Sequence, residues 1–172
     1  MLITCITHAA ARGKEHPFLG LTEQGWQEVD RAADRFKSRA GLEIPKIEAV
    51  VTSPKARCVE TAILLAKAIS EFATTSEVKL ETGLKAGSVS GNELFDIATK
   101  YPFQHLLVSG HADLVRTIPD HVKLIDEAAD GGWFATRPVL FQLEYHVGET
   151  WNNTRLIYCE GLIAGEWRNL TG

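Results

Sequence analysis

The chain has 172 residues, of which 45% are hydrophobic and 23% are charged. This balance is ordinary for a folded globular protein and excludes an intrinsically disordered chain. The formal net charge of −4 argues against nucleic acid as the main partner, because phosphate backbones select clustered lysine and arginine. A small anionic substrate stays compatible, since it needs only a local pocket of positive charge. We expect a single domain over residues 1–172.

The cysteine content favours a reducing compartment. Cys5, Cys58 and Cys159 are far apart and have no CxxC spacing, which argues against a disulfide framework or a zinc site. The first residues do not combine a basic region with an apolar stretch, and no apolar run approaches the roughly 18 residues of a membrane span. We therefore expect a cytoplasmic protein that does not act at a membrane.

Apolar patterning predicts strands and helices that alternate along most of the chain. The expected strands cover residues 2–6, 47–51, 78–81, 104–109, 122–125, 139–147 and 154–159. The expected helices cover residues 22–40, 54–72 and 92–100, with a short helix after His111. This alternation predicts an α/β fold, a three-layer α/β/α sandwich with a mostly parallel central sheet and antiparallel strands at one edge.

Three local features refine these helices. Thr22 is the expected N-cap of the first helix, and Trp26 and Phe36 lie on the apolar stripe that we expect to face the core. Ser53 is an expected cap for the second helix, with Pro54 in the first helical position, where its missing N–H costs nothing.

Polar side chains follow three expected strands at the point where each strand ends. His8 follows the first strand, Ser53 the second, and His111 the strand at 104–109. Because the carboxyl ends of parallel strands meet at one edge of a sheet, we expect these side chains to surround one crevice. Arg57 lies in the first turn of the helix after Ser53, near the positive end of the helix dipole. Two histidines, an arginine and a helix N-terminus predict an anion site.

Four segments in series resemble the histidine phosphatase superfamily, which is the phosphoglycerate-mutase-like group. The family pattern is Arg-His-Gly after a strand, then Leu-Thr-x-x-Gly, Ser-Pro-x-x-Arg-x-x-x-Thr-Ala, and Gly-His after a later strand. The similar segments here are Leu2 to Ala9, Leu21 to Gly25, Ser53 to Ala62 and Val108 to His111. The short chain is similar to the small SixA-like phosphohistidine phosphatases, and the resemblance ends near residue 115.

The resemblance implies a phosphoglycerate-mutase-like fold and a covalent mechanism. His8 would attack phosphorus through one ring nitrogen, and water would hydrolyse the resulting phosphohistidine. His111 and Arg57 would hold the oxygens of the transferring group. No metal ion and no cofactor is implied, because the cationic pocket offsets the charge. A carboxylic acid would protonate the leaving group.

Two residues beside His8 depart from the family pattern. Thr7 stands where the family has arginine, and Ala9 stands where it has glycine. Losing an arginine contact costs about 1.5–3 kcal/mol for each charged hydrogen bond, which is roughly a hundredfold in rate if it falls on the transition state. Arg12 or Lys14 in the following loop could replace it. The expected phosphate-binding residues are thus Arg57, Thr7 and Arg12.

The general acid has two candidates. Glu81 ends the strand at 78–81, near the place where one branch of the family carries its acid, and we take it with His8 and His111 as the expected catalytic set. Asp113 lies two residues after His111, where other branches have an aspartate directly after that histidine.

The leading prediction is a metal-independent phosphatase that acts on a small phosphomonoester or on a phosphohistidine protein. The rival is a relative with weak or no catalysis that binds a phosphorylated ligand or a protein partner. The rival is motivated by Thr7 in place of the arginine and by the unassigned acid.

Overall fold

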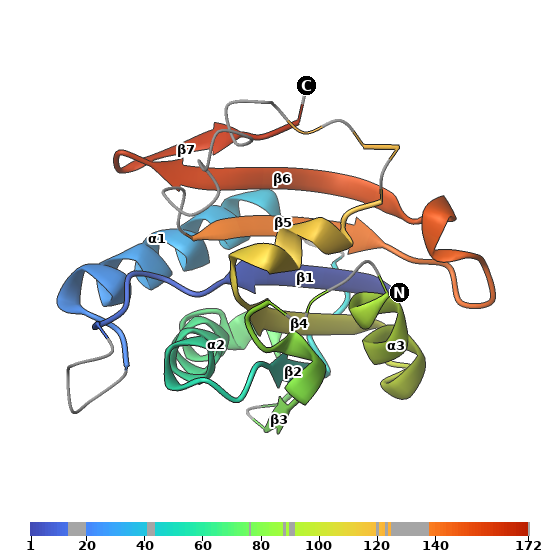
Figure 1. The fold of residues 1–172 in the computed structure, drawn as a ribbon, viewed down its shortest axis with the longest axis horizontal. Helices are drawn as coiled ribbons and strands as arrows, with labels where there is room; N and C mark the ends of the chain where they lie inside the picture. The colour runs from blue at the N-terminus through green and yellow to red at the C-terminus, as the bar shows by residue number, and fades with distance from the viewer. Residues whose placement is uncertain are drawn as a thin grey trace.

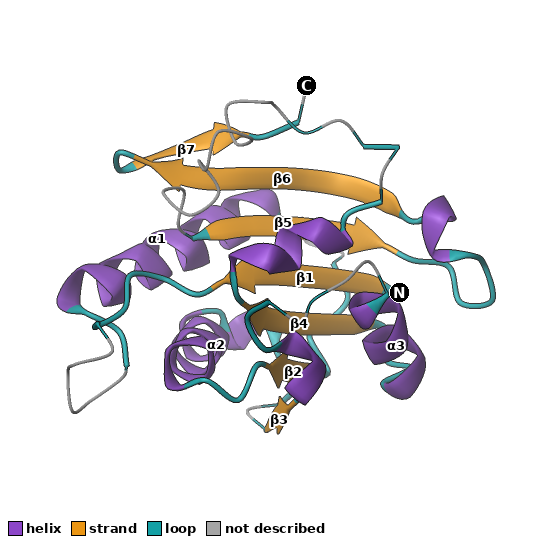
Figure 2. Cartoon of the chain, viewed as in Figure 1, coloured by secondary structure: helices purple, strands orange, loops and turns teal. Residues whose placement is uncertain are grey.

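The computed structural model describes residues 1–13, 20–40, 44–75, 77–87, 89, 92–119, 121, 122, 124 and 138–171. The strands within these ranges are β1 (Leu2–Thr7), β2 (Ala49–Thr52), β3 (Val78–Leu80), β4 (His105–Gly110), β5 (Val139–Glu144), β6 (Arg155–Ile163) and β7 (Glu166–Asn169). The α-helices are α1 (Glu23–Arg39), α2 (Ala56–Ala68) and α3 (Glu93–Lys100). The 3₁₀ helices are η1 (Ser70–Phe72), η2 (Thr82–Leu84), η3 (Ala112–Thr117) and η5 (Trp151–Asn153). Figure 2 shows how helices and strands alternate along the chain.

The strands form one seven-stranded sheet in the order β3-β2-β4-β1-β5-β6-β7, with β3 at one edge and β7 at the other (Figure 1). Strands β1 to β4 pair in parallel, and β5 to β7 pair antiparallel. The predicted α/β class is therefore confirmed, with the antiparallel strands contributed by the C-terminal third. In the β1–β4 register Thr7 lies opposite Gly110, so the chain leaves both strands at the same edge of the sheet.

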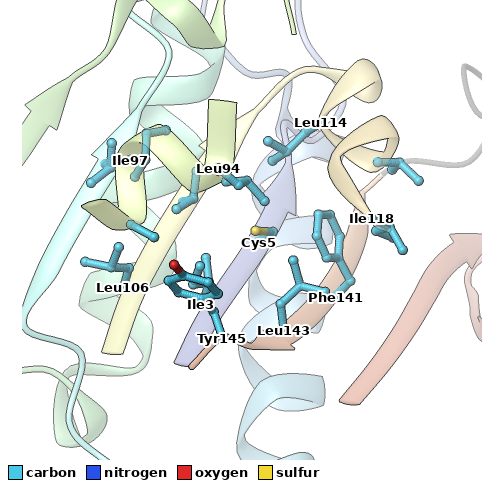
Figure 3. Packing of buried hydrophobic residues seen from close by; sticks show 14 of the residues in the cluster. Ile3, Cys5, Leu94, Ile97, Leu106, Leu114, Ile118, Phe141, Leu143 and Tyr145 are labelled. Atoms are coloured by element: carbon cyan, nitrogen blue, oxygen red, sulfur yellow. The ribbon is translucent and has the colours of Figure 1, made fainter. Parts of the chain in front are cut away.

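Helices cover both faces of the sheet and complete the three layers. Successive residues of β1 point to opposite faces, as the pleat requires. Ile3 and Cys5 pack under α3 and η3, and Figure 3 shows them beside Leu94, Leu114 and Phe141. On the opposite face Ile6, Val50 and Leu107 pack against α1 and α2. Burial of these two apolar layers is the main favourable term in folding.

Helix α1 begins and ends where the sequence predicts. The Thr22 hydroxyl accepts a hydrogen bond from Gly25 N at 3.0 Å, and the helix ends at Arg39. Phe36 is buried as expected, but the prediction for Trp26 is wrong, because 45% of that residue is exposed. The buried stripe includes Gly25, Val29 and Phe36, so it starts one residue before Trp26. The Trp26 indole N–H instead donates to Glu60 Oε1 at 2.8 Å.

Helix α2 begins later than predicted. Lys55 is its N-cap residue, and no side chain caps it, so the expected capping role of Ser53 is wrong. The backbone N–H of Ser53 instead donates to Ser109 O at 3.0 Å and so continues the β2–β4 pairing beyond the end of β2. This extended backbone carries the Ser53 side chain to the carboxyl end of the parallel strands.

The C-terminal strands extend further than predicted. Strand β6 runs to Ile163, and β7 returns along it after a turn at Ala164 and Gly165, which both have positive φ. Of the strand expected at 122–125, only Val122 and Leu124 are described, and Leu124 forms an isolated bridge with Thr171. None of the helices in the described ranges is long and apolar enough to cross a membrane.

Candidate active site

A pocket of about 400 Å³ opens at the carboxyl edge of the parallel strands. Its lining residues come from the loops after β1, η2 and β4 and from the starts of α2 and η3: His8, Ala11, Arg12, Gly13, Arg57, Ala86, Gly87, His111, Ala112, Asp113 and Arg116. A larger hollow of about 680 Å³ lies beside β6 and η5, and its described lining residues include His121 and Arg155 but no carboxylate and no second histidine. We therefore assign the chemistry to the smaller pocket.

His8 lies on the floor of this pocket, with 3% of the residue exposed. Its backbone N–H donates to Gly110 O at 2.8 Å, which joins the loop after β1 to the end of β4. Its ring Nδ1 lies 2.8 Å from Ala9 O, and because a carbonyl oxygen only accepts, Nδ1 carries the proton. The in-plane lone pair of the neutral ring is therefore on Nε2, which is the nitrogen able to act as a nucleophile.

His111 lies beside His8, with ring centroids 5.3 Å apart and an interplanar angle of 80°. Its Nδ1 is 3.5 Å from Nη2 of Arg57, and its Nε2 is 3.3 Å from Oγ of Ser53. Because a guanidinium only donates, His111 Nδ1 is the acceptor and Nε2–H faces the serine hydroxyl. The structure thus brings together the four residues that the sequence predicted to converge.

The loop after His8 is held by two side chains from the helices. Ala9 N donates to the hydroxyl of Thr61 at 3.3 Å, and Ala10 N donates to Glu28 Oε2 at 2.7 Å. The Ala10 carbonyl accepts from Thr22 N at 3.0 Å, and a Cβ added at Gly25 would lie 2.1 Å from that same carbonyl oxygen. The Leu-Thr-x-x-Gly and Thr-Ala motifs therefore support the loop of the nucleophile.

Three arginines line the pocket: Arg12, Arg57 and Arg116. None of the three forms an ion pair within the described part of the chain. Nε of Arg57 is buried without a hydrogen-bond partner among the described residues. Three guanidinium groups without an ion pair to the described residues, around one cavity, make it a candidate anion site. Lys14, the other expected replacement for the missing arginine, lies outside the described residues.

Arg116 was missed by the sequence analysis. It lies three residues after Asp113 in η3, and a 3₁₀ helix places residues i and i+3 on the same face. An aspartate and an arginine at this spacing directly after the Gly-His pair were the available signal.

The geometry does not support the expected phosphate contact of Thr7. The residue is 1% exposed, it is not part of the pocket lining, and its hydroxyl accepts from Val139 N at 2.8 Å. The side chain at the position of the family arginine is therefore used to start β5 next to β1.

The structure places the two candidate acids differently. Glu81 lies outside the pocket lining and accepts hydrogen bonds from Lys100 and Tyr101. Burial raises the pKa of Glu81, but these hydrogen bonds outweigh it and hold the pKa below its ordinary value. Asp113 lines the pocket, and its Oδ2 accepts from Gly87 N at 2.7 Å. Asp113 Oδ1 is buried with no hydrogen-bond partner in the described ranges, so the geometry favours Asp113.

No cluster of three or more histidine, cysteine, aspartate or glutamate side chains within the described ranges could hold a metal ion. The three cysteines are buried, and none of them forms a disulfide. The most distinctive residues of the pocket are thus the histidine pair, the three arginines and Asp113.

Comparison with known proteins places the fold. No family model and no curated protein sequence matches the chain. A structure of the protein histidine phosphatase SixA complexed with tungstate matches with a TM-score of 0.62 and 15% identity, covering 92% of this chain and 96% of that one. A protein of Agrobacterium tumefaciens assigned as a SixA phosphohistidine phosphatase matches with a TM-score of 0.60 and 18% identity over the same shares.

A third match is a phosphoserine phosphatase from Entamoeba histolytica in complex with 3-phosphoglyceric acid. Its TM-score is 0.55 at 13% identity, covering 92% of this chain and 95% of that one. Such likenesses confirm at the level of the fold the resemblance found in the sequence. The chain has the phosphoglycerate-mutase-like fold of the histidine phosphatase superfamily and resembles its SixA branch.

Proposed function

We propose that this protein is a metal-independent phosphatase that hydrolyses a phosphomonoester or a phosphohistidine through a phosphohistidine intermediate on His8. One observation carries the proposal. His8 and His111 lie with ring centroids 5.3 Å apart on the floor of a pocket that is also lined by Arg12, Arg57 and Arg116. The proposed partner is a small phosphorylated molecule or a phosphoprotein, not nucleic acid. Three buried cysteines without a disulfide support the expectation of a reducing, cytoplasmic compartment.

In the first step the lone pair of His8 Nε2 attacks phosphorus and the bond from phosphorus to the leaving oxygen breaks. The Nδ1 proton bound to Ala9 O keeps the ring in the tautomer that this attack needs. Asp113 donates its proton to the leaving oxygen, so the leaving group departs as a neutral alcohol. Arg57 and Arg12 offset the charge that spreads over the phosphoryl oxygens in the transition state.

In the second step water attacks the phosphorus of the phosphohistidine. The Asp113 carboxylate takes the proton of the water, the bond from phosphorus to Nε2 breaks, and phosphate and free His8 are regenerated. Splitting one displacement into two easier ones is the gain of covalent catalysis. His111 stays beside His8 throughout, and its Nδ1 accepts from Nη2 of Arg57, which holds that guanidinium in the pocket.

The structural neighbours support a phosphatase. One is a protein histidine phosphatase with bound tungstate, a tetrahedral oxyanion of the same shape as phosphate, and another is a phosphoserine phosphatase. Both share the fold of this chain, with TM-scores of 0.62 and 0.55.

The rival function is phosphate-dependent binding without turnover. The Thr7 hydroxyl is bound to Val139 N, so the family position of an arginine contributes no charge to the pocket. Under this reading the arginines hold a phosphorylated ligand, and the attack on phosphorus is too slow to matter.

The test compares wild type with His8→Ala on p-nitrophenyl phosphate at mildly acidic pH. We expect turnover by wild type alone, and a phosphorylated wild-type protein after an alkaline quench, since phosphohistidine is labile in acid. Tungstate binding is measured in parallel by thermal shift, with Arg57→Ala as the variant that should weaken it. If the two proteins hydrolyse the ester equally slowly while Arg57→Ala weakens tungstate binding, the rival function replaces the phosphatase. If Arg57→Ala changes neither the rate of ester hydrolysis nor the binding of tungstate, both proposed functions are wrong.

A further inference from the structure

Two short backbone segments pair at the base of the loop that carries Arg12 to the pocket. Ala11 and Leu21 are partners in an antiparallel bridge, and Arg12 N donates to Gly20 O at 3.0 Å. We call residues 11–12 and 20–21 the loop base. Because Arg12 is both a member of the loop base and a lining residue of the pocket, the place of its side chain depends on where this pairing lies.

The carboxylate of Glu60 connects the loop base to helix α2. Its Oε2 accepts from Leu21 N at 2.7 Å, and its Oε1 accepts from the indole N–H of Trp26 at 2.8 Å. Both oxygens are therefore engaged by N–H donors from a distant part of the chain. Hydrogen bonds to an ionised acceptor are stronger than those between neutral groups, so this carboxylate is able to fix the backbone at Leu21.

Gly20 provides the space that this contact needs. A Cβ added at Gly20 would lie 2.2 Å from Glu60 Oε2, far inside van der Waals contact. The carboxylate thus approaches the backbone where a side chain is missing. Gly20 O is also the acceptor for Arg12 N, so one side-chain bond and one backbone bond lead from Glu60 to Arg12.

The position of Glu60 in α2 relates two arginines of the pocket to each other. Glu60 lies three residues after Arg57, about one helical turn, and is itself outside the pocket lining. The same helix therefore contributes the guanidinium of Arg57 directly and holds the backbone from which Arg12 extends. Any effect of Glu60 on a bound anion has to pass through the loop base.

We propose that Glu60 is a positioning residue of the candidate anion site, whose carboxylate holds the loop base so that Arg12 lies at the pocket. The inference rests on the proposed function and concerns how its site is assembled. Thr7, at the family position of an arginine, is bound to Val139 N and contributes no charge to the pocket. Holding Arg12 in place is then what supplies a second guanidinium beside that of Arg57.

The test measures the dissociation constant of tungstate by isothermal titration calorimetry, which needs no turnover. Glu60→Ala removes both acceptor oxygens and should raise this constant about fivefold to tenfold. Gly20→Ala should weaken binding in the same way, because its Cβ displaces the carboxylate. Glu60→Gln keeps a carbonyl oxygen for Leu21 N and turns its amide toward the exposed Trp26, so it should bind within about twofold of wild type.

A double-mutant cycle separates positioning from a general loss of structure. Arg12→Ala should also raise the dissociation constant, and adding Glu60→Ala to it should cause no further rise, because no guanidinium is left to position. The proposal is wrong if Glu60→Ala weakens binding equally with and without Arg12. It is also wrong if Arg12→Ala or Glu60→Ala binds tungstate like wild type.

Glu48→Ala is the matched control. Glu48 Oε2 accepts from Gln104 N at 2.6 Å, directly before β4 and so at the end of that strand away from the pocket. This variant also loses a half-buried carboxylate that binds a backbone N–H, and it should leave tungstate binding unchanged even where it lowers the free energy of unfolding. If it weakens binding as much as Glu60→Ala does, lower stability explains the loss and the positioning role is overturned.

Failure of the phosphatase has a different signature. If wild type hydrolyses p-nitrophenyl phosphate no faster than His8→Ala while the tungstate cycle behaves as expected, the phosphatase is wrong and Glu60 positions Arg12 in a binding protein. If hydrolysis depends on His8 but tungstate binding does not respond to Glu60→Ala, the phosphatase stands and the positioning role is wrong.

Discussion

The proposed chemistry of His8 depends on a contact between its ring and the backbone of the next residue. The carbonyl of Ala9 accepts from Nδ1 at 2.8 Å, and this leaves Nε2 as the nitrogen with the lone pair. The motif predicted a histidine at the end of the first strand, but not its tautomer, because the tautomer is set by how the loop folds after Ala9. Thr61 and Glu28, which bind that loop, come from helices far away in the sequence.

Asp113 provides the sharpest residue-level prediction. Asp113→Asn should lower kcat for an alkyl phosphate by about 10²–10⁴, the usual contribution of general acid–base catalysis. p-Nitrophenyl phosphate releases a stable phenolate that needs little proton donation, so the formation of its phosphoenzyme should change far less. Rapid-quench measurement of the first turnover with both esters checks this.

Glu81→Gln is the matched control, because Glu81 is held by Lys100 and Tyr101 away from the pocket. It should leave the rates of hydrolysis of both esters, the alkyl phosphate and p-nitrophenyl phosphate, unchanged. If Glu81→Gln lowers kcat for the alkyl phosphate as much as Asp113→Asn does, Glu81 and not Asp113 is the general acid.

At the scale of elements, the contact between the start of α1 and the loop after β1 is tight. A Cβ at Gly25 would lie 2.1 Å from Ala10 O, and this backbone atom already accepts from Thr22. Gly25→Ala should therefore displace the nucleophile loop, lowering both kcat and the free energy of unfolding, the latter by about 1–3 kcal/mol. Urea denaturation and steady-state kinetics measure the two effects.

Gly83→Ala serves as the comparison, since the nearest atom to a Cβ there is at 3.6 Å, an ordinary contact. Its effects on the free energy of unfolding and on kcat should be much smaller than those of Gly25→Ala. If Gly25→Ala behaved like Gly83→Ala, the helix would not be what holds the loop in place.

Elements with local signals were predictable, and elements defined by distant contacts were not. The cap at Thr22 and the strand at β1 were predicted from neighbouring residues. The β6–β7 hairpin was missed because Ala164, not the usual glycine or asparagine, adopts φ of 50° at its turn. The sequence pattern started the buried stripe of α1 at Trp26, one residue too late. Gly25, where the stripe starts, has no side chain and so gives no apolar signal.

The same distinction holds for the pocket. His8, Arg57 and His111 converge as predicted, because their strands are parallel and adjacent in the sheet. Thr7 could not be placed from the sequence, since its partner is the backbone of Val139, 132 residues later in the chain. Its hydroxyl supports the junction of the parallel and antiparallel halves of the sheet.

For the whole molecule, the two ends of the central strands have different roles. His111 follows the carboxyl end of β4 in the pocket, while His105 begins the same strand at the opposite end. His105 is completely buried and belongs to a polar chain that crosses the sheet. Its Nδ1 is 2.7 Å from Pro45 O, its Nε2 is 2.9 Å from the Thr4 hydroxyl, and that hydroxyl accepts from Gln142 Nε2 at 2.9 Å.

This chain requires a neutral His105. Pro45 O accepts the Nδ1 proton, so Nε2 must accept the proton of the Thr4 hydroxyl. Burial lowers the pKa of His105, outweighing the hydrogen bond to Pro45 and the charge of Glu48, which raise it; the N-terminal charge lowers it further. Protonation would set two donors, Nε2–H and Thr4 O–H, against each other inside the protein.

Stability should therefore depend on pH through a group far from the pocket. The folded-state pKa of His105 lies below the ordinary value of 6.5. The stability that the neutral ring contributes is therefore complete above pH 6.5, and it is lost as the pH falls toward the folded-state pKa. The free energy of unfolding should fall by up to about 1.4 kcal/mol per pH unit in that window. His105→Asn keeps a donor for Pro45 but cannot titrate, so its unfolding free energy should fall less steeply between pH 7 and pH 5. Urea denaturation of both proteins across this range measures the difference, and parallel curves would show that another group controls the acid sensitivity.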